Sequence, residues 1–227
     1  DLKKNIPHIR GVYLFKDEKD VIYVGKSNDL RGRIFSYFGN SLGEKTRAMV
    51  ESANTLDFVK VDSELDALLL EARLIRTYKP KYNSISKDDK SPLYIGLTSS
   101  EFPKVLILRE RDLKAGIYKL RQDFGPFASV GVVRSVLKRI RKVFPFCQQK
   151  KTDRPCFYSH LGLCNPCPSS ISKLKGKERA EAKRLYLKNI KMLEKVLAGK
   201  STIVKQTLIK EMQEAGEKLL FEKAQVV

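Results

Sequence analysis

The sequence predicts an α+β fold, in which a small three-stranded antiparallel sheet is flanked by helices and followed by further αβ and helical segments. Residues 10–16 and 21–25 are rich in Val, Ile, Tyr and Phe, which is typical of two strands of a hairpin. Residues 64–78 instead carry apolar side chains at helical spacing. All four cysteines fall in residues 147–167, which sets this segment apart from the predicted strands and helices.

The composition indicates a folded protein that binds an anionic partner. Of the 227 residues 42% are hydrophobic, which is enough for a core. The 45 Lys and Arg exceed the 26 Asp and Glu by 19 charges, which favours a nucleic acid or an anionic membrane surface. No apolar run approaches the roughly 18 residues that cross a bilayer, and residues 1–7 lack an apolar secretory segment. We therefore expect a cytoplasmic protein that acts on nucleic acid and not on a membrane.

The first predicted hairpin brings two tyrosines together. A symmetric turn over residues 16–20 sets Gly11 opposite Gly25 and Tyr13 opposite Tyr23. Both tyrosines then lie on one face of the sheet. An aromatic pair in a core is the ordinary explanation for such an arrangement, and the residues that follow favour a functional one.

A polar stripe follows the hairpin. Lys26 comes first, and Asn28 or Asp29 is a suitable N-cap for the next helix. Apolar residues recur every four positions in that helix, and Arg33 and Tyr37 form a polar stripe beside them. Arg33 can therefore point back toward the hairpin, although a solvated surface arginine is the common alternative.

Three further elements complete the first predicted domain. We expect a helix over residues 44–53, a strand over 56–61 and a helix over 64–78. Ser63 caps the last of these, and Lys79-Pro80 ends it.

One acidic and one amide side chain of this region can complete a site. Glu71 lies at the border of the apolar stripe of its helix, where a carboxylate is half buried. Burial of a carboxylate costs free energy unless a cation or metal pairs with it. A surface glutamate in a salt bridge is the alternative. Asn83, beyond the helix, can return a side-chain amide to the same place.

A basic amphipathic helix is expected in the second αβ region, over residues 132–143, after a strand over 103–110. A charged helical face is often merely solvated. The net charge of +19 favours contact with a DNA backbone instead. The candidate DNA-binding residues are Arg134, Lys138, Arg139, Arg141 and Lys142.

The cysteines predict a metal site. In a reducing compartment, clustered thiols indicate metal binding rather than disulfides. Cys147, Cys156, Cys164 and Cys167 end in a C-x-x-C pair and can hold zinc tetrahedrally or a [4Fe–4S] cluster. The spacing does not choose between the two, and four buried free thiols are the remaining alternative.

In this order, the residues resemble the GIY-YIG nuclease superfamily. Its two name motifs stand here as Gly11-Val12-Tyr13 and Tyr23-Val24-Gly25, and the later residues follow at suitable spacing. The resemblance implies a DNA endonuclease in which Glu71 holds one Mg²⁺ or Mn²⁺ ion, a role that suits a carboxylate. It also implies that Tyr23 acts as general base and that Arg33 grips the phosphate. Lys26 would help the metal to lower the pKa of Tyr23, and Tyr13, Tyr37 and Asn83 would complete the hydrogen-bonded shell.

A narrower resemblance, to the UvrC family of excinuclease subunits, covers nearly the whole chain. It rests on residues 87–92, 124–127, 143–146, 154–156 and 162–164. It implies the incision on the 3′ side of a lesion in nucleotide excision repair, damaged double-stranded DNA as substrate, and UvrA–UvrB as the complex that finds the lesion. It favours iron–sulfur at the cysteines. A non-cutting DNA-binding adaptor and a structure-specific or homing GIY-YIG endonuclease are the alternatives.

The predicted organisation has five parts. The RNase H-like half that makes the 5′ cut in that family has no room here, so we expect either a fragment or a short relative. The last part resembles a UVR helical hairpin whose second helix breaks off, so we expect no tight direct binding of UvrB. The parts are a GIY-YIG domain over residues 1–90, an αβ extension over 91–145, a four-cysteine module over 146–170, a charged helix over 171–200 and a partial hairpin over 201–227.

Overall fold

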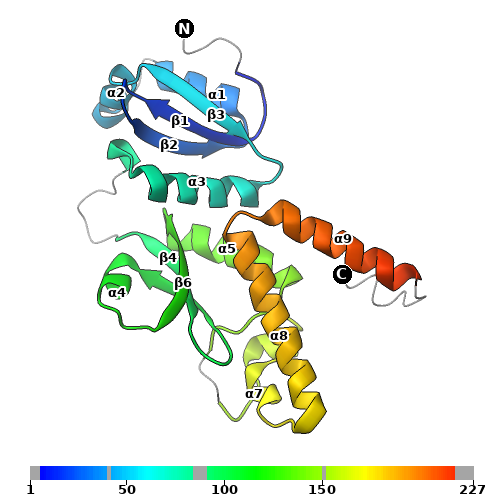
Figure 1. Ribbon diagram of the computed structural model, residues 1–227. Helices are drawn as coiled ribbons and strands as arrows, with labels where there is room; N and C mark the ends of the chain where they lie inside the picture. Colours follow the sequence, from blue (N-terminus) through cyan, green and yellow to red (C-terminus); the bar gives the residue numbers. More distant parts are fainter. Residues whose placement is uncertain (1–5, 40–41, 84–90, 150–151, 218–227) are drawn as a thin grey trace. The chain divides into compact units, whose positions relative to one another are not determined.

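The computed structural model describes residues 6–39, 42–83, 91–149 and 152–217. The chain divides into two compact units (Figure 1), one within residues 1–93 and 125–128, the other within 94–124 and 129–227. Among the described residues, no helix combines the length and the apolarity that crossing a bilayer requires.

The first unit is built on a three-stranded antiparallel sheet. Its strands are β1 (Gly11–Lys16), β2 (Val21–Ser27) and β3 (Thr55–Lys60), in the order β2-β1-β3. Side chains of the central strand alternate between the two faces of the sheet. Tyr13 and Phe15 enter one hydrophobic cluster, and Val12 and Leu14 enter another. The predicted small antiparallel sheet is confirmed.

Helices cover both faces of this sheet (Figure 1). On the tyrosine face lie α1 (Leu30–Phe35), the 3₁₀ turn η1 (Ser36–Phe38) and α2 (Glu44–Glu51), which supply Leu30, Ile34, Tyr37 and Met49 to the core. On the other face lies α3 (Glu64–Tyr78), which packs Ala67 against Val12 and Leu14. A second 3₁₀ turn, η2 (Lys81–Asn83), follows it.

Local signals fix the ends of α3 where the sequence predicts them. The Ser63 hydroxyl accepts a hydrogen bond from the amide of Asp66 at 3.0 Å and caps the first turn. Lys79 adopts a left-handed conformation, with φ of 47°, and ends the helix before Pro80. The predicted bounds of this helix are confirmed.

The register predicted for the hairpin is wrong. Tyr13 lies opposite Gly25 rather than Tyr23, and Gly11 lies opposite Ser27 rather than Gly25. Tyr23 pairs instead with Phe15. A shift of two residues leaves every side chain on its expected face, because side chains alternate with a period of two. Tyr13 and Tyr23 therefore remain neighbours, with ring centroids 6.1 Å apart.

An asymmetric turn causes the shift. The Asp17 carboxylate accepts hydrogen bonds from the amides of Lys19 and Asp20 at 2.9 and 2.7 Å. The chain reverses within these residues, and Lys16 pairs with Val21 beyond an irregularity in the ladder. Such a bond from an aspartate to its own local backbone favours a tight turn over a symmetric loop.

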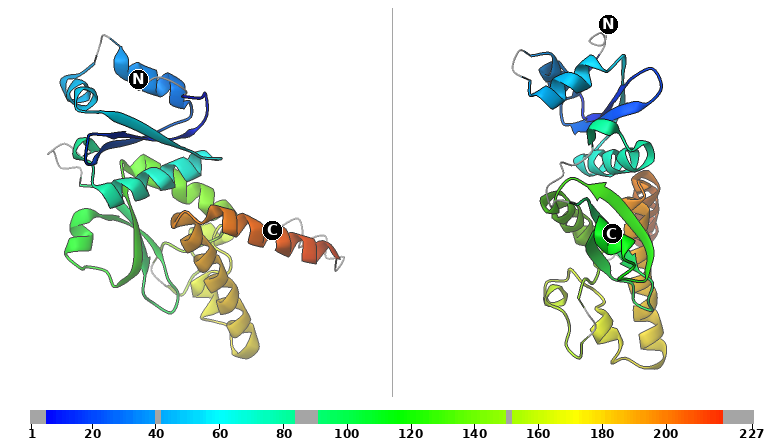
Figure 2. Two further views of the ribbon diagram at one scale, coloured as in Figure 1. Left: turned by 45° about the horizontal axis from the view of Figure 1, so that its top comes forward. Right: turned by 90° about the vertical axis from the view of Figure 1, so that its left-hand side faces the viewer.

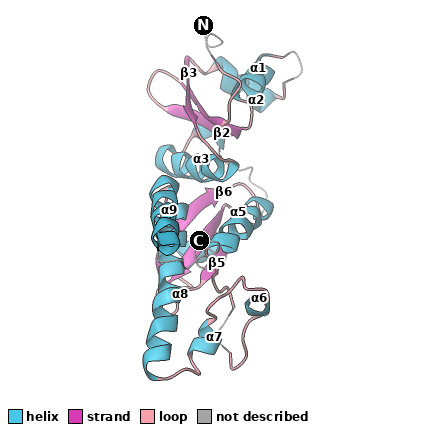
Figure 3. Ribbon diagram, turned by 90° about the vertical axis from the view of Figure 1, so that its right-hand side faces the viewer, coloured by secondary structure: helices cyan, strands magenta, loops and turns pink. Residues whose placement is uncertain are grey.

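Another three-stranded sheet lies mostly in the second unit. Its strands β4 (Leu93–Thr98), β5 (Val105–Arg109) and β6 (Leu120–Phe127) lie in the order β5-β4-β6, with α4 (Glu110–Lys114) between β5 and β6. Figure 3 shows this sheet between α5 (Val130–Val143) and α8 (Gly176–Leu197). The strand and the basic helix predicted in this region are confirmed, with shorter and longer bounds respectively.

The charged helix α8 docks on the turn between β4 and β5. The buried Tyr186 hydroxyl donates to the carbonyl of Pro103 at 2.6 Å, and its ring lies 5.9 Å from that of Phe102. Nearby, the Glu101 carboxylate accepts from Lys183 at 3.0 Å. Between this helix and α5 the chain forms two short helices, α6 (Phe157–His160) and α7 (Pro168–Ile171).

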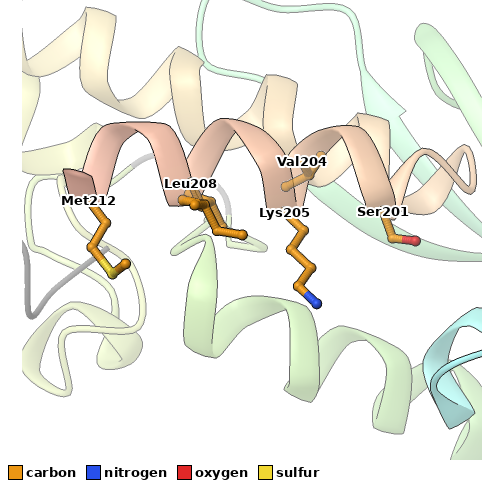
Figure 4. Close-up of a pocket in the computed structure, with 6 residues that line it drawn as sticks. Ser201, Val204, Lys205, Leu208 and Met212 are labelled. Carbon is orange, nitrogen blue, oxygen red and sulfur yellow. The ribbon is translucent and has the colours of Figure 1, made fainter. Parts of the chain in front are cut away.

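The last described helix is α9 (Ser201–Glu217), which leads away from the end of α8 (Figure 2). Val204 is buried, whereas Ile209 and Met212 are exposed. A groove of about 250 Å³ follows the helix, and Figure 4 shows its apolar side chains in a row. The second helix of the predicted hairpin lies outside the described residues.

Candidate active site and metal centre

Three tyrosines of the first unit form a hydrogen-bonded cluster on the α1 face of the sheet. Tyr13 comes from β1, Tyr23 from β2 and Tyr37 from the turn after α1. The hydroxyls of Tyr13 and Tyr37 are 2.7 Å apart, and Tyr37 Oη donates to Tyr23 Oη at 3.5 Å. Tyr37 therefore links the other two hydroxyls.

Arg33 joins this cluster from α1, as the sequence predicts. Its Nε donates to Tyr13 Oη at 3.2 Å, and its guanidinium carbon lies 5.0 Å from the centre of the Tyr37 ring. The side chain is otherwise exposed. Because the bond to Tyr13 uses Nε, the terminal nitrogens of the planar fork remain available to an anion.

The protein keeps the three hydroxyls neutral at pH 7. Burial raises the pKa of Tyr13 and of Tyr37 to about 12. Burial and the contact with Tyr37 raise the pKa of Tyr23. The cation that lowers the pKa of Tyr23 is Arg33, and not Lys26 as we expected.

Glu71 reaches the outer edge of β2 from α3. Its Oε1 accepts a hydrogen bond from the backbone amide of Lys26 at 3.2 Å. Burial raises the pKa of the Glu71 carboxyl, and the Lys26 charge and this hydrogen bond oppose the rise. Lys26 therefore lowers the pKa of Glu71 rather than that of Tyr23. Within the described part of the chain, no hydrogen bond joins Glu71 to a tyrosine.

Asn83 binds the same edge of β2 at Val24, two residues before Lys26. Its Oδ1 accepts from the Val24 amide, and its Nδ2 donates to the Val24 carbonyl, both at 2.7 Å. Because β2 is an outer strand, these backbone groups have no strand beside them, and the side-chain amide takes its place. Asn83 thus positions the strand that carries Tyr23 and does not bond to the tyrosine hydroxyls.

Gly25 belongs to the tyrosine cluster although no role was predicted for it beyond its place in the second name motif. Tyr13 lies opposite it in the ladder, and a Cβ at Gly25 would lie 2.5 Å from Tyr13 Cζ. Only glycine leaves room for the Tyr13 ring to reach Tyr37 and Arg33. The glycine of the second name motif could have indicated this close packing. The predicted register set Gly25 opposite Gly11 instead of Tyr13, so the contact was not predicted.

The surroundings of Glu71 fit a hard divalent cation. Mg²⁺ in proteins commonly takes one or two carboxylate oxygens and keeps several waters. Glu71 offers one half-buried carboxylate whose charge burial destabilises, so that a cation beside it recovers free energy. The Asn83 amide is already used by Val24, which leaves Glu71 as the candidate protein ligand.

The four cysteines meet in the second unit. Their Sγ atoms all lie within 4.8 Å of one another, and all four residues are buried. They stand in loops and at the N-terminal ends of α6 and α7. Four converging thiolates suit zinc or an iron–sulfur cluster. The predicted four-sulfur ligand set, Cys147, Cys156, Cys164 and Cys167, is therefore brought together.

Arg141 was predicted to lie on an exposed basic face, and this prediction is wrong, because Arg141 binds the cysteine loops instead. It is 4% exposed, and its guanidinium carbon lies 3.9 Å and 4.0 Å from the ring centres of Phe146 and Tyr158. Its Nη1 donates to the carbonyls of Phe146 and Leu163, which directly precede two of the cysteines. Burial lowers the pKa of Arg141, and Tyr158 and the nearby cysteines oppose this. The other four candidate DNA-binding residues of α5 are exposed: Arg134, Lys138, Arg139 and Lys142.

Two family models match the chain in succession. The one described as the UvrC-like GIY-YIG domain matches residues 9–84, and the one described as the UvrC/Cho excinuclease middle domain matches residues 92–184. The chain belongs to the UvrC family. The tyrosine cluster, Arg33, Glu71 and Asn83 lie within the first match, and the cysteines and α5 lie within the second.

Curated UvrC relatives match nearly the whole chain. The UvrABC system protein C of Carboxydothermus hydrogenoformans is 39% identical over 97% of this chain and 35% of that protein. The corresponding protein of Methanothermobacter thermautotrophicus is 35% identical over 97% of this chain and 36% of that protein. The chain therefore spans about a third of the length of these relatives.

A solved UvrC structure also resembles part of the chain. It is the GIY-YIG N-terminal endonuclease domain of UvrC from Thermotoga maritima bound to its catalytic divalent cation, magnesium. The identity is 41%, over 35% of this chain and 89% of that one, with a TM-score of 0.34.

Proposed function

We propose that this chain cuts DNA by divalent-metal-dependent phosphodiester hydrolysis and makes the 3′ incision of nucleotide excision repair. The observation that carries the proposal is the assembly of Arg33 and three linked tyrosines on one face of a sheet, with Glu71 at the edge of the same strand as Tyr23. The match of residues 92–184 to an excinuclease middle domain supports the repair setting.

Each protein group has a distinct task in this proposal. Arg33, held at Nε by Tyr13, neutralises the scissile phosphate with its outer nitrogens. Tyr23 Oη first loses its own proton to bulk water and then takes a proton from the attacking water. Tyr37 Oη donates to Tyr23 Oη and orients it. The raised pKa of Tyr23 means that its proton leaves only when positive charge is near. Glu71 would hold Mg²⁺ or Mn²⁺, which supplies that charge and Lewis-acid stabilisation of the phosphate.

Incision of a lesion-bearing duplex tests the proposal. The protein is incubated with Mg²⁺ or Mn²⁺, with and without a UvrA–UvrB complex, and the cut is mapped on each strand. We expect one cut on the 3′ side of the lesion. Glu71→Gln and Arg33→Ala should each slow it by about 100-fold or more with DNA binding intact. The matched control is Arg31→Ala on the same helix, because Arg31 bonds to the Ile6 carbonyl instead.

The outcomes separate the candidate functions. Cutting at the wild-type rate by Glu71→Gln or Arg33→Ala would remove these residues from the mechanism. Binding without cleavage under every condition would support a non-cutting adaptor. Cleavage that ignores the lesion and follows DNA shape or sequence would support another type of GIY-YIG endonuclease.

The general base has its own test. Tyr23→Phe removes only the hydroxyl and should slow incision by about 100- to 10,000-fold. Tyr78→Phe, an exposed tyrosine at the end of α3, should cut at the wild-type rate. Equal rates for Tyr23→Phe and the control would assign proton transfer to another group.

We infer that the cysteines hold a [4Fe–4S] cluster, with Zn²⁺ as the alternative. The resemblance to the UvrC family supports the iron–sulfur cluster. The sulfur spacing supports zinc, because thiolates around one Zn²⁺ lie about 3.8 Å apart and the Sγ atoms here lie within 4.8 Å of one another. Visible absorbance and elemental analysis of anaerobically purified protein distinguish the two. Protein with neither iron nor zinc would overturn both.

DNA and the UvrA–UvrB complex are the proposed partners. On α9, Ile203, Ile209 and Met212 leave apolar surface exposed for a helical partner. We still expect no tight binding of UvrB by the described part of this helix alone. Calorimetric titration of UvrB measures this, and submicromolar affinity that Met212→Lys abolishes would contradict the expectation.

A further inference from the structure

A pocket of about 410 Å³ lies beside α5 in the second unit. Its lining combines four cations with the ring of Tyr158, the amide of Gln148 and three aliphatic side chains. No Asp or Glu belongs to this lining among the described residues. The volume is in the range of sites that hold a small organic ligand, and the charge selects an anion.

The rim cations form a row. Arg134, Lys138 and Lys142 recur every fourth residue, so they lie on one side of α5 and are all exposed. Neighbours in this row are about 6 Å apart along the helix axis, comparable with the distance between successive phosphates of one DNA strand. The row therefore suits an extended strand better than an isolated anion.

The floor of the pocket is fixed before a ligand arrives. Arg141 is clamped between the rings of Phe146 and Tyr158, and one of its terminal nitrogens donates to Gln148. The hydrogen-bond acceptors of Arg141 are neutral oxygens of Phe146, Leu163 and Gln148. Within the described part of the chain no carboxylate bonds to this guanidinium, so it adds positive charge at the base of the pocket.

The remaining lining is apolar and suits a planar base. Leu137, Leu163 and Ile107 supply aliphatic surface, and Tyr158 supplies a ring. Next to Tyr158, Phe157 is 66% exposed. Aromatic side chains in a positively charged groove bind bases of single strands by stacking, with little dependence on sequence.

We propose that this pocket binds one unpaired nucleotide of a DNA strand, with its phosphate on Lys138 and Lys142 and its base against Tyr158 and Leu163. The proposal rests on the proposed function only in taking DNA as the partner. It gives the second unit a preference for unpaired over paired strands, because a base within a duplex cannot enter the pocket.

Fluorescence anisotropy with a labelled oligothymidylate tests the pocket, without added divalent ion so that the strand stays intact. Lys138→Gln should weaken binding by about fivefold or more, because a charge-assisted contact to phosphate is lost. Lys191→Gln is the matched control, since it removes the same charge from an exposed lysine of α8 that does not line the pocket. We expect less than a twofold change for the control. Unchanged circular dichroism and bound metal establish that both variants are folded.

A second oligonucleotide distinguishes recognition of a whole nucleotide from recognition of its phosphate alone. An abasic strand of equal length and charge should bind the wild type about fivefold or more weakly than oligothymidylate, because stacking is lost. A duplex of the same length should also bind more weakly. Equal losses for Lys138→Gln and Lys191→Gln would overturn the pocket in favour of general attraction to the DNA backbone. Equal affinity for abasic and normal strands would overturn the contact with the base and leave only binding of the phosphate. Neither outcome touches incision by the tyrosine centre, which is measured separately with Glu71→Gln.

Discussion

The tyrosine centre of the first unit and the cysteine centre of the second gather distant residues in opposite ways. In the tyrosine centre the protein itself supplies the partners, since Tyr13 bonds to Tyr37 and Arg33, and Asn83 bonds to Val24. These groups stand on a three-stranded sheet with a core on each face. The cysteine centre instead stands on loops and two helices of four residues each.

The difference teaches what each metal contributes. An ion at Glu71 adds chemistry to a structure whose hydrogen bonds are already made. An ion or cluster at the cysteines would add the bonds that hold the loops together, so that its binding free energy would become folding free energy. We therefore expect changes at the tyrosine centre to alter the incision rate more than the stability. Changes at the cysteine centre should mainly alter the stability.

The largest stability effect should come from the cysteine centre. Cys164→Ser should release the metal and destabilise the second unit by about 4 kcal/mol or more. Thermal unfolding followed by circular dichroism, together with the metal content per chain, measures this. Glu71→Gln should unfold close to the wild-type temperature. A Cys164→Ser variant as stable as the wild type would break the distinction between the two centres.

Gly25→Ala should have the next largest effect and should lower both rate and stability. The new Cβ overlaps the buried Tyr13 ring, and overpacking of this kind costs about 1–3 kcal/mol. Displacement of Tyr13 also moves the anchor of Arg33, so incision should fall about tenfold or more. Gly43→Ala is the control, because a Cβ there meets nothing within 4 Å. Normal incision by Gly25→Ala would show that the position of Tyr13 does not matter.

Asn83→Ala should cost about 1–2 kcal/mol, because it removes two hydrogen bonds from the partly buried backbone of Val24. Chemical denaturation measures the loss. Asn28→Ala removes an exposed hydrogen bond to Arg10 and should change stability by less than about 0.5 kcal/mol. Equal losses in the two variants would contradict the role of Asn83 as a clamp on β2.

The smallest effect on stability should come from Glu71→Gln in metal-free protein, and this substitution should stabilise the fold where the others destabilise it. Burial raises the folded pKa of Glu71, so its contribution to stability is present below the unfolded pKa and is lost as pH rises through the folded value. At pH 7 the ionised carboxylate is therefore a cost, and Gln should raise the unfolding temperature slightly. The gain should vanish below about pH 4, where the carboxyl is protonated in both states. A lower unfolding temperature at pH 7 would show that the carboxylate stabilises the fold.

The sequence predicts the parts of this protein that depend on local patterns. The three strands of the first sheet, the helix from Ser63 to Lys79 and the basic helix before the cysteines all follow from side-chain periodicity and caps. The orientation of Arg33 follows from helical spacing in the same way.

The parts that failed depend on contacts that periodicity does not encode. The hairpin register follows from the bonds that the Asp17 carboxylate makes within the turn. The burial of Arg141 follows from two carbonyls and two rings contributed largely by the cysteine loops. A pattern of charges on one helix contains no information about a loop that folds over it, so Arg141 looked like its exposed neighbours.

Asn83 and Glu71 also cover the outer edge of β2. Val24 and Lys26 point backbone amides outward from the sheet, and Asn83 and Glu71 accept them. An outer strand with open amides is a template for another strand, and therefore for aggregation. The side chains proposed to serve catalysis thus also protect the sheet from pairing with a second copy of the chain. A variant that lost both Asn83 and Glu71 would present a bare edge rich in Val, Ile and Tyr.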